Sequence, residues 1–238
     1  MESSKTVILK FGFYSTIALT LLTITTFGFA MIAVPPAGPY CPGNCMDYPF
    51  RNLLDYYPRD YYWMYLAVFQ IFSFVIFVIS VHYIAQVDKR IFSTVGIAFA
   101  IISTTVLLAD YFIQFATVPI SMLNGETEGI ALITQYNGHG IFIALEELGY
   151  ITMSIALFFL AFVFPSNNKL EKSIRWILFL PLFLNILTFV LFSIKYGIDR
   201  NYRFEVASIS IDWIFIIIAG VLISIYFNRL IRKQILKN

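Results

Sequence analysis

The chain is poor in charged residues. Asp, Glu, Lys and Arg make up only 13% of its 238 residues, whereas hydrophobic residues make up 59%. Soluble domains carry about 25% charged residues, and so large an apolar share is atypical of them. The composition therefore excludes an ordinary soluble domain and predicts an integral membrane protein with membrane lipids as partners. The net charge of only +2 gives no strongly basic surface, so we expect no nucleic-acid partner.

Histidine is also scarce, with only His82 and His139 in the chain. A catalytic zinc ion commonly takes about three protein ligands, usually imidazole or thiolate groups. The two histidines fall at positions that we expect on opposite faces of the membrane. This distribution excludes a membrane hydrolase that holds zinc through three histidines. A carboxylate-rich site beside His139 for Ca²⁺ or Zn²⁺ stays open as an alternative.

Cysteine is equally scarce, and the two residues present are Cys41 and Cys45. The intervening Pro-Gly turn brings them together, and an oxidising compartment permits a disulfide between them. We expect this disulfide to be structural. The alternative is a membrane thiol oxidoreductase, which requires further cysteines for electron relay and usually has C-x-x-C spacing.

Several catalytic motifs are missing. The chain has no phosphate-binding G-x-x-x-x-G-K-[ST] loop, no G-x-S-x-G elbow and no H-E-x-x-H motif. The hydrophobic segments contain no lysine, which a retinal Schiff base requires. Glu146-Glu147 matches the start of the E-E-x-x-x-R motif of CAAX-type membrane proteases, but Ile151 occupies the arginine position and no histidine follows. These absences predict no cofactor, and they leave open whether the chain is an enzyme.

The hydrophobic residues are gathered in long runs. A helix of about 20 apolar residues crosses the ~30 Å hydrocarbon core of a bilayer. The first run has about 24 apolar residues and is too long for a signal-peptide core of about 7–15, so we expect an uncleaved helix. Pro181 should kink the fifth segment. We predict an all-α bundle of six transmembrane helices in a single domain spanning 1–238, with segments at 11–34, 61–87, 92–118, 140–164, 176–194 and 206–227.

Lysine and arginine predict the orientation, because cytoplasmic loops are rich in both. Eleven of the 16 fall on the side that carries the two termini, and five fall on the other side. We therefore expect both termini in the cytoplasm, in the plasma membrane, and residues 35–60 as an external loop. The aromatic stretch 55–63 is typical of an interfacial anchor, with a ligand-gripping lid as the alternative. The five external cations are Arg51, Arg59, Lys195, Arg200 and Arg203.

Four carboxylates lie inside the predicted segments: Asp110, Glu146, Glu147 and Asp212. An acidic residue at the centre of a membrane costs roughly 2.5–3.5 kcal/mol on insertion scales, so it indicates a functional site. Their positions place all four roughly 9–12 Å from the external ends of their helices, at ~1.5 Å per residue. They should therefore form one layer in the outer half of the membrane.

Helical spacing predicts which side chains accompany these acids. Asp110 and Gln114 share a face, and His139, Glu146 and Tyr150 share another. These faces should turn toward the interior, because charged groups are costly in contact with lipid. We expect Asp110, Glu146 and Asp212 to approach one polar cavity, with at least two of them inside it. Gln114 and Tyr150 should line this cavity, and His139 should lie at its mouth.

Three functions agree with this pattern. The leading hypothesis is an outward-facing acidic pocket that binds or transports a cation, a proton or a small amine-bearing solute. The second is a membrane-embedded enzyme that acts on a lipid or isoprenoid through carboxyl acid–base chemistry. The third is a structural or partner-binding subunit, in which Lys195, Arg200 or Arg203 pair with the acids and hydroxyl groups satisfy the rest. The sequence does not predict an oligomeric state.

Overall fold

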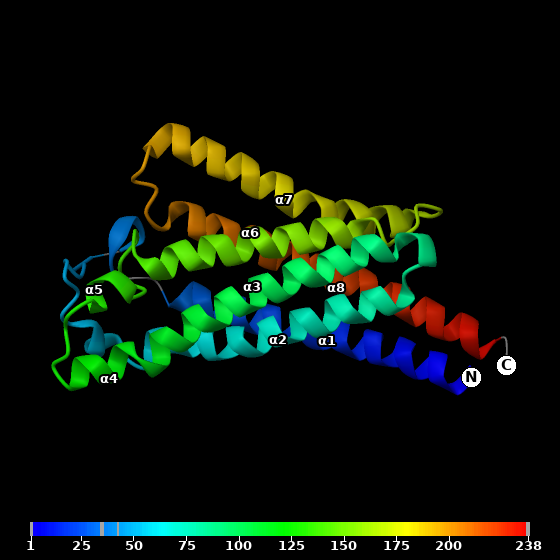
Figure 1. The fold of residues 1–238 in the computed structure, drawn as a ribbon, viewed down its shortest axis with the longest axis horizontal. Coiled ribbons are helices and arrows are strands. Elements are labelled where there is room, and N and C mark those ends of the chain that lie inside the picture. Colours follow the sequence, from blue (N-terminus) through cyan, green and yellow to red (C-terminus); the bar gives the residue numbers. More distant parts are fainter. Residues whose placement is uncertain (1, 34–35, 42, 237–238) are drawn as a thin grey trace.

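Membrane-length helices dominate the fold (Figure 1). The computed structural model describes residues 2–33, 36–41 and 43–236. Six of its helical stretches are long and apolar enough to cross a membrane, which confirms the predicted helical membrane bundle. The six long helices are α1 (Glu2–Ile32), α2 (Tyr62–Ile84), α3 (Arg90–Ala116), α6 (Ile141–Ala161), α7 (Lys169–Tyr196) and α8 (Tyr202–Ile235).

Several helices extend beyond the predicted segments. The segment predicted at 206–227 belongs to α8, which begins at Tyr202 and ends at Ile235. The segment predicted at 176–194 lies within α7, which begins at Lys169. Hydropathy marks only the apolar part of a helix, whereas the backbone hydrogen bonds continue through charged residues at either end. The predicted end of the first segment, at 34, lies outside the described residues.

Close helix contacts hold the bundle together. Helix α1 packs against α2 and α8, and α3 packs mainly against α6. Small residues permit these contacts, as is typical of membrane helices. A Cβ atom at Gly220 of α8 would clash with the Thr20 side chain of α1, and one at Gly149 of α6 would clash with Leu107 of α3.

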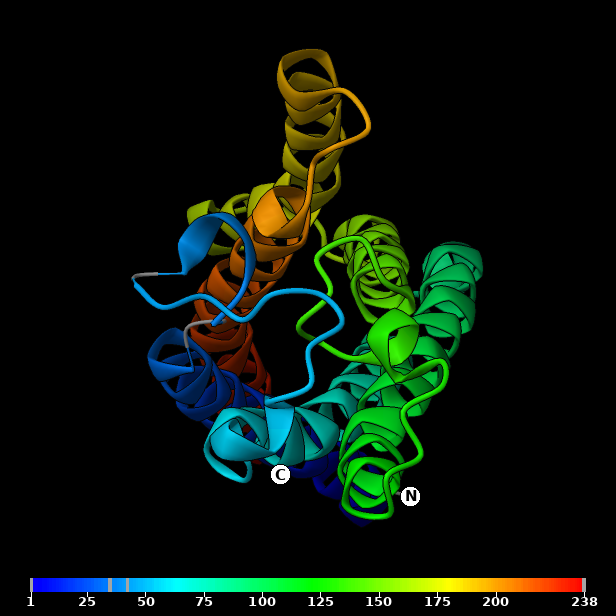
Figure 2. The same cartoon turned by 90° about the vertical axis from the view of Figure 1, so that its left-hand side faces the viewer.

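Helix α7 lies at the edge of the bundle, and one end of it projects away from the other helices (Figure 2). It packs mainly against α6 and α8. Only 17% of the most apolar 18-residue stretch of α7 is buried, compared with 56% of the corresponding stretch of α6. Pro181 lies within this helix, and the helix continues on both sides of it. The exposed apolar surface of α7 is the kind that lipid covers in a membrane protein.

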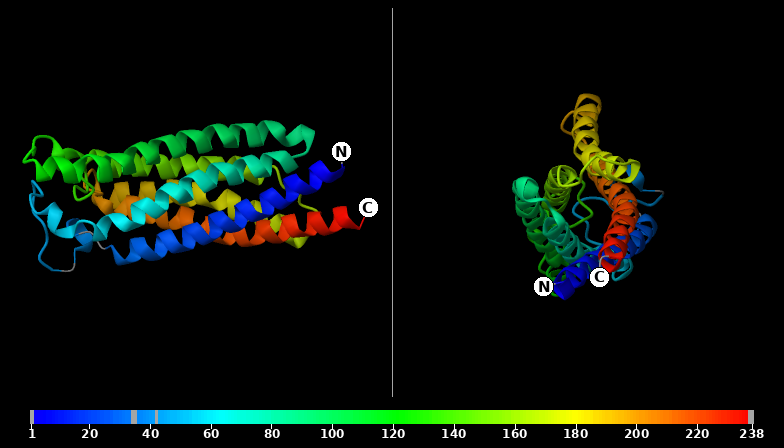
Figure 3. Two further views of the ribbon diagram at one scale, coloured as in Figure 1. Left: turned by 90° about the horizontal axis from the view of Figure 1, so that it is seen from below. Right: turned by 90° about the vertical axis from the view of Figure 1, so that its right-hand side faces the viewer.

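The connection between α1 and α2 and the connection between α3 and α6 lie at one end of the bundle, and together they form a folded cap (Figure 2). The cap includes the short helices α4 (Val118–Leu123) and α5 (Ile130–Ile133). Its own apolar cluster includes Phe50, Leu53 and Tyr136. Both chain ends lie at the opposite end of the bundle (Figure 3).

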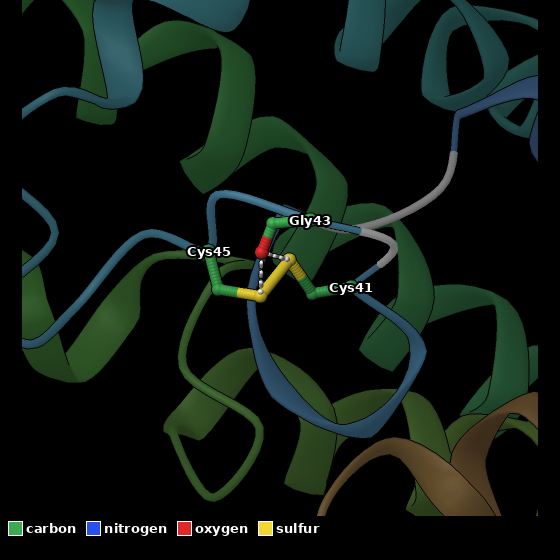
Figure 4. The surroundings of a disulfide bond; sticks show 3 residues. All are labelled: Cys41, Gly43 and Cys45. Atoms are coloured by element: carbon green, nitrogen blue, oxygen red, sulfur yellow. Dashed lines mark hydrogen bonds between the residues drawn. A yellow bond between two sulfur atoms is a disulfide. The ribbon is translucent and has the colours of Figure 1, made fainter.

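The cap contains the disulfide between Cys41 and Cys45. The carbonyl oxygen of Gly43 points toward the two sulfur atoms and lies 3.1 Å from Sγ of Cys45 (Figure 4). The aromatic stretch 55–63 is divided between two environments. Tyr57 and Tyr62 are exposed, as expected of an interfacial anchor, whereas Trp63 is buried inside the bundle.

Candidate functional site

Two of the predicted acids lie close together inside the bundle. Asp110 on α3 is 1% exposed and Glu146 on α6 is fully buried. The two carboxyl groups are within electrostatic range of each other. Helices α3 and α6 are extensively packed, so both carboxyl groups face protein interior and not lipid.

Two tyrosine hydroxyls form a hydrogen-bonded chain that ends at Glu146. The hydroxyl of Tyr111 donates to Oε1 of Glu146 at 2.8 Å. The hydroxyls of Tyr111 and Tyr150 lie 2.9 Å apart. Both tyrosines are fully buried, so these hydrogen bonds are shielded from solvent and are worth more than in water. The result is a continuous chain of hydroxyl and carboxyl groups between α3 and α6.

Glu205 on α8 completes the cluster, although the sequence analysis missed it. Glu205 and Glu146 line the same cavity. Glu205 was missed because the predicted segment began at 206, whereas α8 begins at Tyr202. The useful signal was the i, i+7 spacing of Glu205 and Asp212, which places both on one face of the helix.

No cation in the described part of the chain pairs with this cluster. The ion pairs found there join Arg59 with Asp60 and Arg200 with Glu147. One oxygen each of Asp110, Glu146 and Glu205 is buried without a hydrogen-bond partner. A buried charge of this kind is costly unless a proton or a cation compensates it. The cluster is therefore suited to binding positive charge.

A cavity of about 120 Å³ reaches the two glutamates. Five of its fifteen lining residues are aromatic, and the rings of Trp63 and Trp213 meet edge to face with centroids 6.4 Å apart. Its rim includes Met31 of α1 and Val206 of α8, both exposed, so it opens between these helices. The cavity lining includes Phe27, Trp63, Phe142, Glu146, Glu205 and Trp213.

The cap closes the cavity from the end of the bundle. Gln135 lines it, and the backbone oxygen of Gln135 accepts a 3.0 Å hydrogen bond from the Tyr202 hydroxyl. Tyr136 donates to Oδ2 of the buried Asp60 at 3.3 Å. Burial raises the pKa of the Tyr136 hydroxyl, so the hydroxyl stays protonated and keeps this donor role. These two hydrogen bonds hold the part of the cap that contains Gln135 and Tyr136 over the acidic cluster.

Gln114 belongs to the cap and not to the cavity wall. Its side-chain nitrogen donates to the backbone oxygen of Ile133, and its side-chain oxygen accepts from the backbone nitrogen of Gln135 at 2.9 Å. Both ends of the amide are therefore used to hold the cap. Gln114 does share the buried face of α3 with Asp110, as its spacing predicted.

His139 and Glu147 lie elsewhere, in a separate groove of about 180 Å³. Glu147 pairs with Arg200 at 3.5 Å, and Arg200 lines the same groove. The expected stripe of His139 with Glu146 and Tyr150 is wrong for His139, because α6 begins only at Ile141 and helical spacing does not apply before it. The expectation of His139 at the mouth of the acidic cavity is corrected accordingly.

Asp212 also lies apart from the cavity lining. It is fully buried, and its Oδ1 accepts hydrogen bonds from Ser154 of α6 and Asn185 of α7. Asp110 does not line the cavity either, so the expectation that at least two of Asp110, Glu146 and Asp212 lie in one cavity is wrong: of the three, only Glu146 lines it. In the residues that the structure describes, no group of three or more His, Cys, Asp or Glu side chains is arranged to hold a metal ion.

The fold and the site define a polytopic helical membrane protein with a buried acidic and aromatic cavity. No protein-family model matches the chain, and neither a curated protein nor a solved structure shows a significant match to it.

Proposed function

We propose that this protein binds a small amine-bearing solute in the cavity between α1 and α8 and carries it across the membrane. The observation that supports this most strongly is the pair Glu146 and Glu205, which line an aromatic cavity without a basic partner among the described residues. An ammonium group supplies both the missing positive charge and hydrogen-bond donors for the carboxyl oxygens.

The cavity walls favour an organic cation over an inorganic one. Trp63, Trp213 and Phe142 offer aromatic surfaces, and aromatic faces attract ammonium groups by about 0.5–2 kcal/mol each. An inorganic cation takes its ligands mainly from oxygen atoms. The rings provide none, so only part of its coordination shell would be filled.

The cavity volume limits the size of the buried group. Cavities for drug-sized ligands measure about 300–1,000 Å³, whereas this cavity measures about 120 Å³. An engineered protein cavity of about 150 Å³ accommodates benzene. The buried part of the ligand is therefore about the size of one ring, and any longer apolar tail leaves between Met31 and Val206.

We further propose the plasma membrane as the location, with both termini in the cytoplasm and the cap outside. The distribution of Lys and Arg supports this orientation, because ten of the 15 in the described part of the chain belong to the helix ends and turns opposite the cap. The disulfide at the opposite end supports it as well, because disulfides persist in oxidising compartments.

Binding is testable through the fluorescence of tryptophan. Two of the three tryptophans, Trp63 and Trp213, line the cavity, and Trp176 lies beside a different pocket. Benzylammonium should cause a saturable change in fluorescence, and benzyl alcohol, which has the same ring without the charge, should not. The double variant Glu146→Gln/Glu205→Gln should lose at least tenfold in affinity, whereas Glu147→Gln should keep it.

Equal titration by benzyl alcohol, or an equal loss in Glu147→Gln, would contradict binding at the glutamate pair. Transport is tested separately with radiolabelled benzylammonium, and empty liposomes measure the leak of the neutral amine through lipid. Proteoliposomes with the wild-type chain should take it up faster than empty liposomes. Binding without uptake would reduce the proposal to a binding protein.

The alternative is an enzyme that acts on a lipid or isoprenoid, and one observation favours it. The hydroxyl chain from Tyr150 through Tyr111 to Glu146 provides a proton path beside a cavity whose rim is exposed and apolar. In that case Glu146 is the general acid or base. Conversion of membrane lipid, followed by mass spectrometry and lost in Glu146→Gln, would favour the enzyme. A chain with neither binding, flux nor turnover would be a structural subunit.

A further inference from the structure

A second polar cluster is buried between α6, α7 and α8. Asn185 donates through its side-chain nitrogen to Oγ of Ser154 at 2.6 Å and to Oδ1 of Asp212 at 3.1 Å. Oγ of Ser154 lies 2.5 Å from the same Oδ1 atom. The exposed fraction of each of the three residues is 1% or less. The cluster brings one carboxyl group together with neutral hydroxyl and amide groups.

Three oxygens of this region have no hydrogen-bond partner. They are Oδ2 of Asp212, Oδ1 of Asn185 and Oγ of Ser208, and all three are buried. Buried polar atoms in proteins nearly always have a partner. Ser208 lies one turn before Asp212 on α8, so the two side chains share one face of the helix.

The charge of Asp212 also lacks a partner. Its hydrogen bonds come from the neutral groups of Ser154 and Asn185, and no ion pair found among the described residues includes it. The titratable groups nearest to it on the other side are Tyr150 and, beyond it, the glutamate pair, none of which supplies positive charge. An isolated buried charge is costly, so either a proton or a bound cation must compensate it.

The ligand set decides the kind of cation. Divalent ions such as Ca²⁺ collect six to eight oxygens, commonly with several carboxylates. Here one carboxylate is combined with neutral oxygens from Ser208 and Asn185, and its single negative charge balances a single positive charge. Hydroxyl, amide and carboxylate oxygens are hard ligands, so they suit a hard monovalent ion.

We propose that Asp212, Asn185 and Ser208 form a Na⁺ site inside the membrane, separate from the amine cavity. The site uses the three unsatisfied oxygens as ligands, and Ser154 orients the carboxylate and the amide through its hydrogen bonds. Its existence does not depend on amine binding at Glu146 and Glu205.

Thermal unfolding of the purified full chain in detergent tests the site. NaCl is titrated against N-methyl-D-glucamine chloride at constant ionic strength, with KCl as a second series. The wild-type Tm should rise and saturate with Na⁺. Asp212→Asn, which keeps the shape of the side chain and loses its charge, should abolish this rise. Ser208→Ala should raise the half-saturating Na⁺ concentration at least tenfold, and Glu147→Gln should leave the titration unchanged.

Other outcomes overturn the site. A wild-type Tm that does not respond to Na⁺ at any pH, with a pH dependence that Asp212→Asn removes, would mean that Asp212 holds a proton. An unchanged Na⁺ response in Ser208→Ala, or a loss in Glu147→Gln, would place the ion elsewhere. If Asp212→Asn does not fold, Ser208→Ala decides the question. Benzylammonium binding measured without Na⁺ shows separately whether the amine cavity is intact.

Discussion

The hydroxyl of Tyr111 on α3 lies 2.8 Å from the carboxyl oxygen Oε1 of Glu146 on α6, and both side chains are fully buried. The hydrogen bond connects the most extensively packed pair of helices to the acidic cavity. The second oxygen of the same carboxyl group, Oε2, is buried without a hydrogen-bond partner. The position of the Glu146 carboxyl group therefore depends on Tyr111.

Tyr111→Phe should weaken binding of benzylammonium about tenfold. The ring keeps its packing, but Glu146 loses a donor that orients its carboxyl group, and a hydrogen bond to a charged group contributes about 1.5–3 kcal/mol. Tryptophan fluorescence measures the affinity. Tyr48→Phe is the control, because Tyr48 is 72% exposed. Equal affinities of the two variants would show that Tyr111 does not position Glu146.

Gly220→Ala should destabilise the bundle by about 1–3 kcal/mol, the usual cost of overpacking. The added Cβ would clash with the Thr20 side chain, which is held by its own 2.8 Å hydrogen bond to the backbone oxygen of Thr16. Gly28→Ala is the matched control within α1, since its Cβ would meet nothing within 4 Å. Unfolding in a denaturing detergent measures both, and a control as unstable as Gly220→Ala would argue against the α1–α8 contact.

Gly138→Ala should loosen the cap over the cavity. Its Cβ would clash with Asn201 and lie 2.9 Å from the Tyr202 ring, at the point where the cap meets the start of α8. We expect faster hydrogen exchange at the backbone of Gln135 and its neighbours, with little change in α3 or α6. Gly43→Ala, whose Cβ meets nothing within 4 Å, should exchange like the wild type. Unchanged exchange in Gly138→Ala would mean that this contact does not hold the cap.

Single cysteines in a Cys41→Ser/Cys45→Ser background test the orientation. Asn124→Cys in the cap should react with a membrane-impermeant maleimide on intact cells. Lys169→Cys, at the other end of the bundle, should react only after permeabilisation. Both positions are exposed, so access from the aqueous side is the variable. The reverse pattern would place both termini outside.

The bundle was predictable because membrane-length apolar runs give few alternatives: backbone groups in lipid must be satisfied within a helix. The ends were less predictable, as α8 shows. Because Arg200 and Arg203 are charged, the sequence predicted a loop up to residue 205, although α8 already begins at Tyr202. Glu205 was missed for this reason alone.

The burial of the candidate site residues was predictable, but their grouping was only partly so. Helical spacing correctly turned Asp110 and Glu146 toward the interior. Sequence spacing within one helix does not say which helix lies opposite, so it did not separate Asp212 from Glu146. Nor did it show that Trp63 enters the cavity, because the boundary between an interfacial aromatic stretch and a buried one depends on how α2 rotates against its neighbours.

The most direct measurement is the structure of the protein with 4-bromobenzylammonium, located by the anomalous signal of its bromine atom. The ammonium group should lie within hydrogen-bond distance of the Glu146 and Glu205 carboxyl groups. The ring should lie among Trp63, Phe142 and Trp213, with the bromine directed toward Met31 and Val206. A ligand found in the groove beside Glu147 and Arg200, or only on the lipid-facing surface, would contradict amine recognition by the glutamate pair.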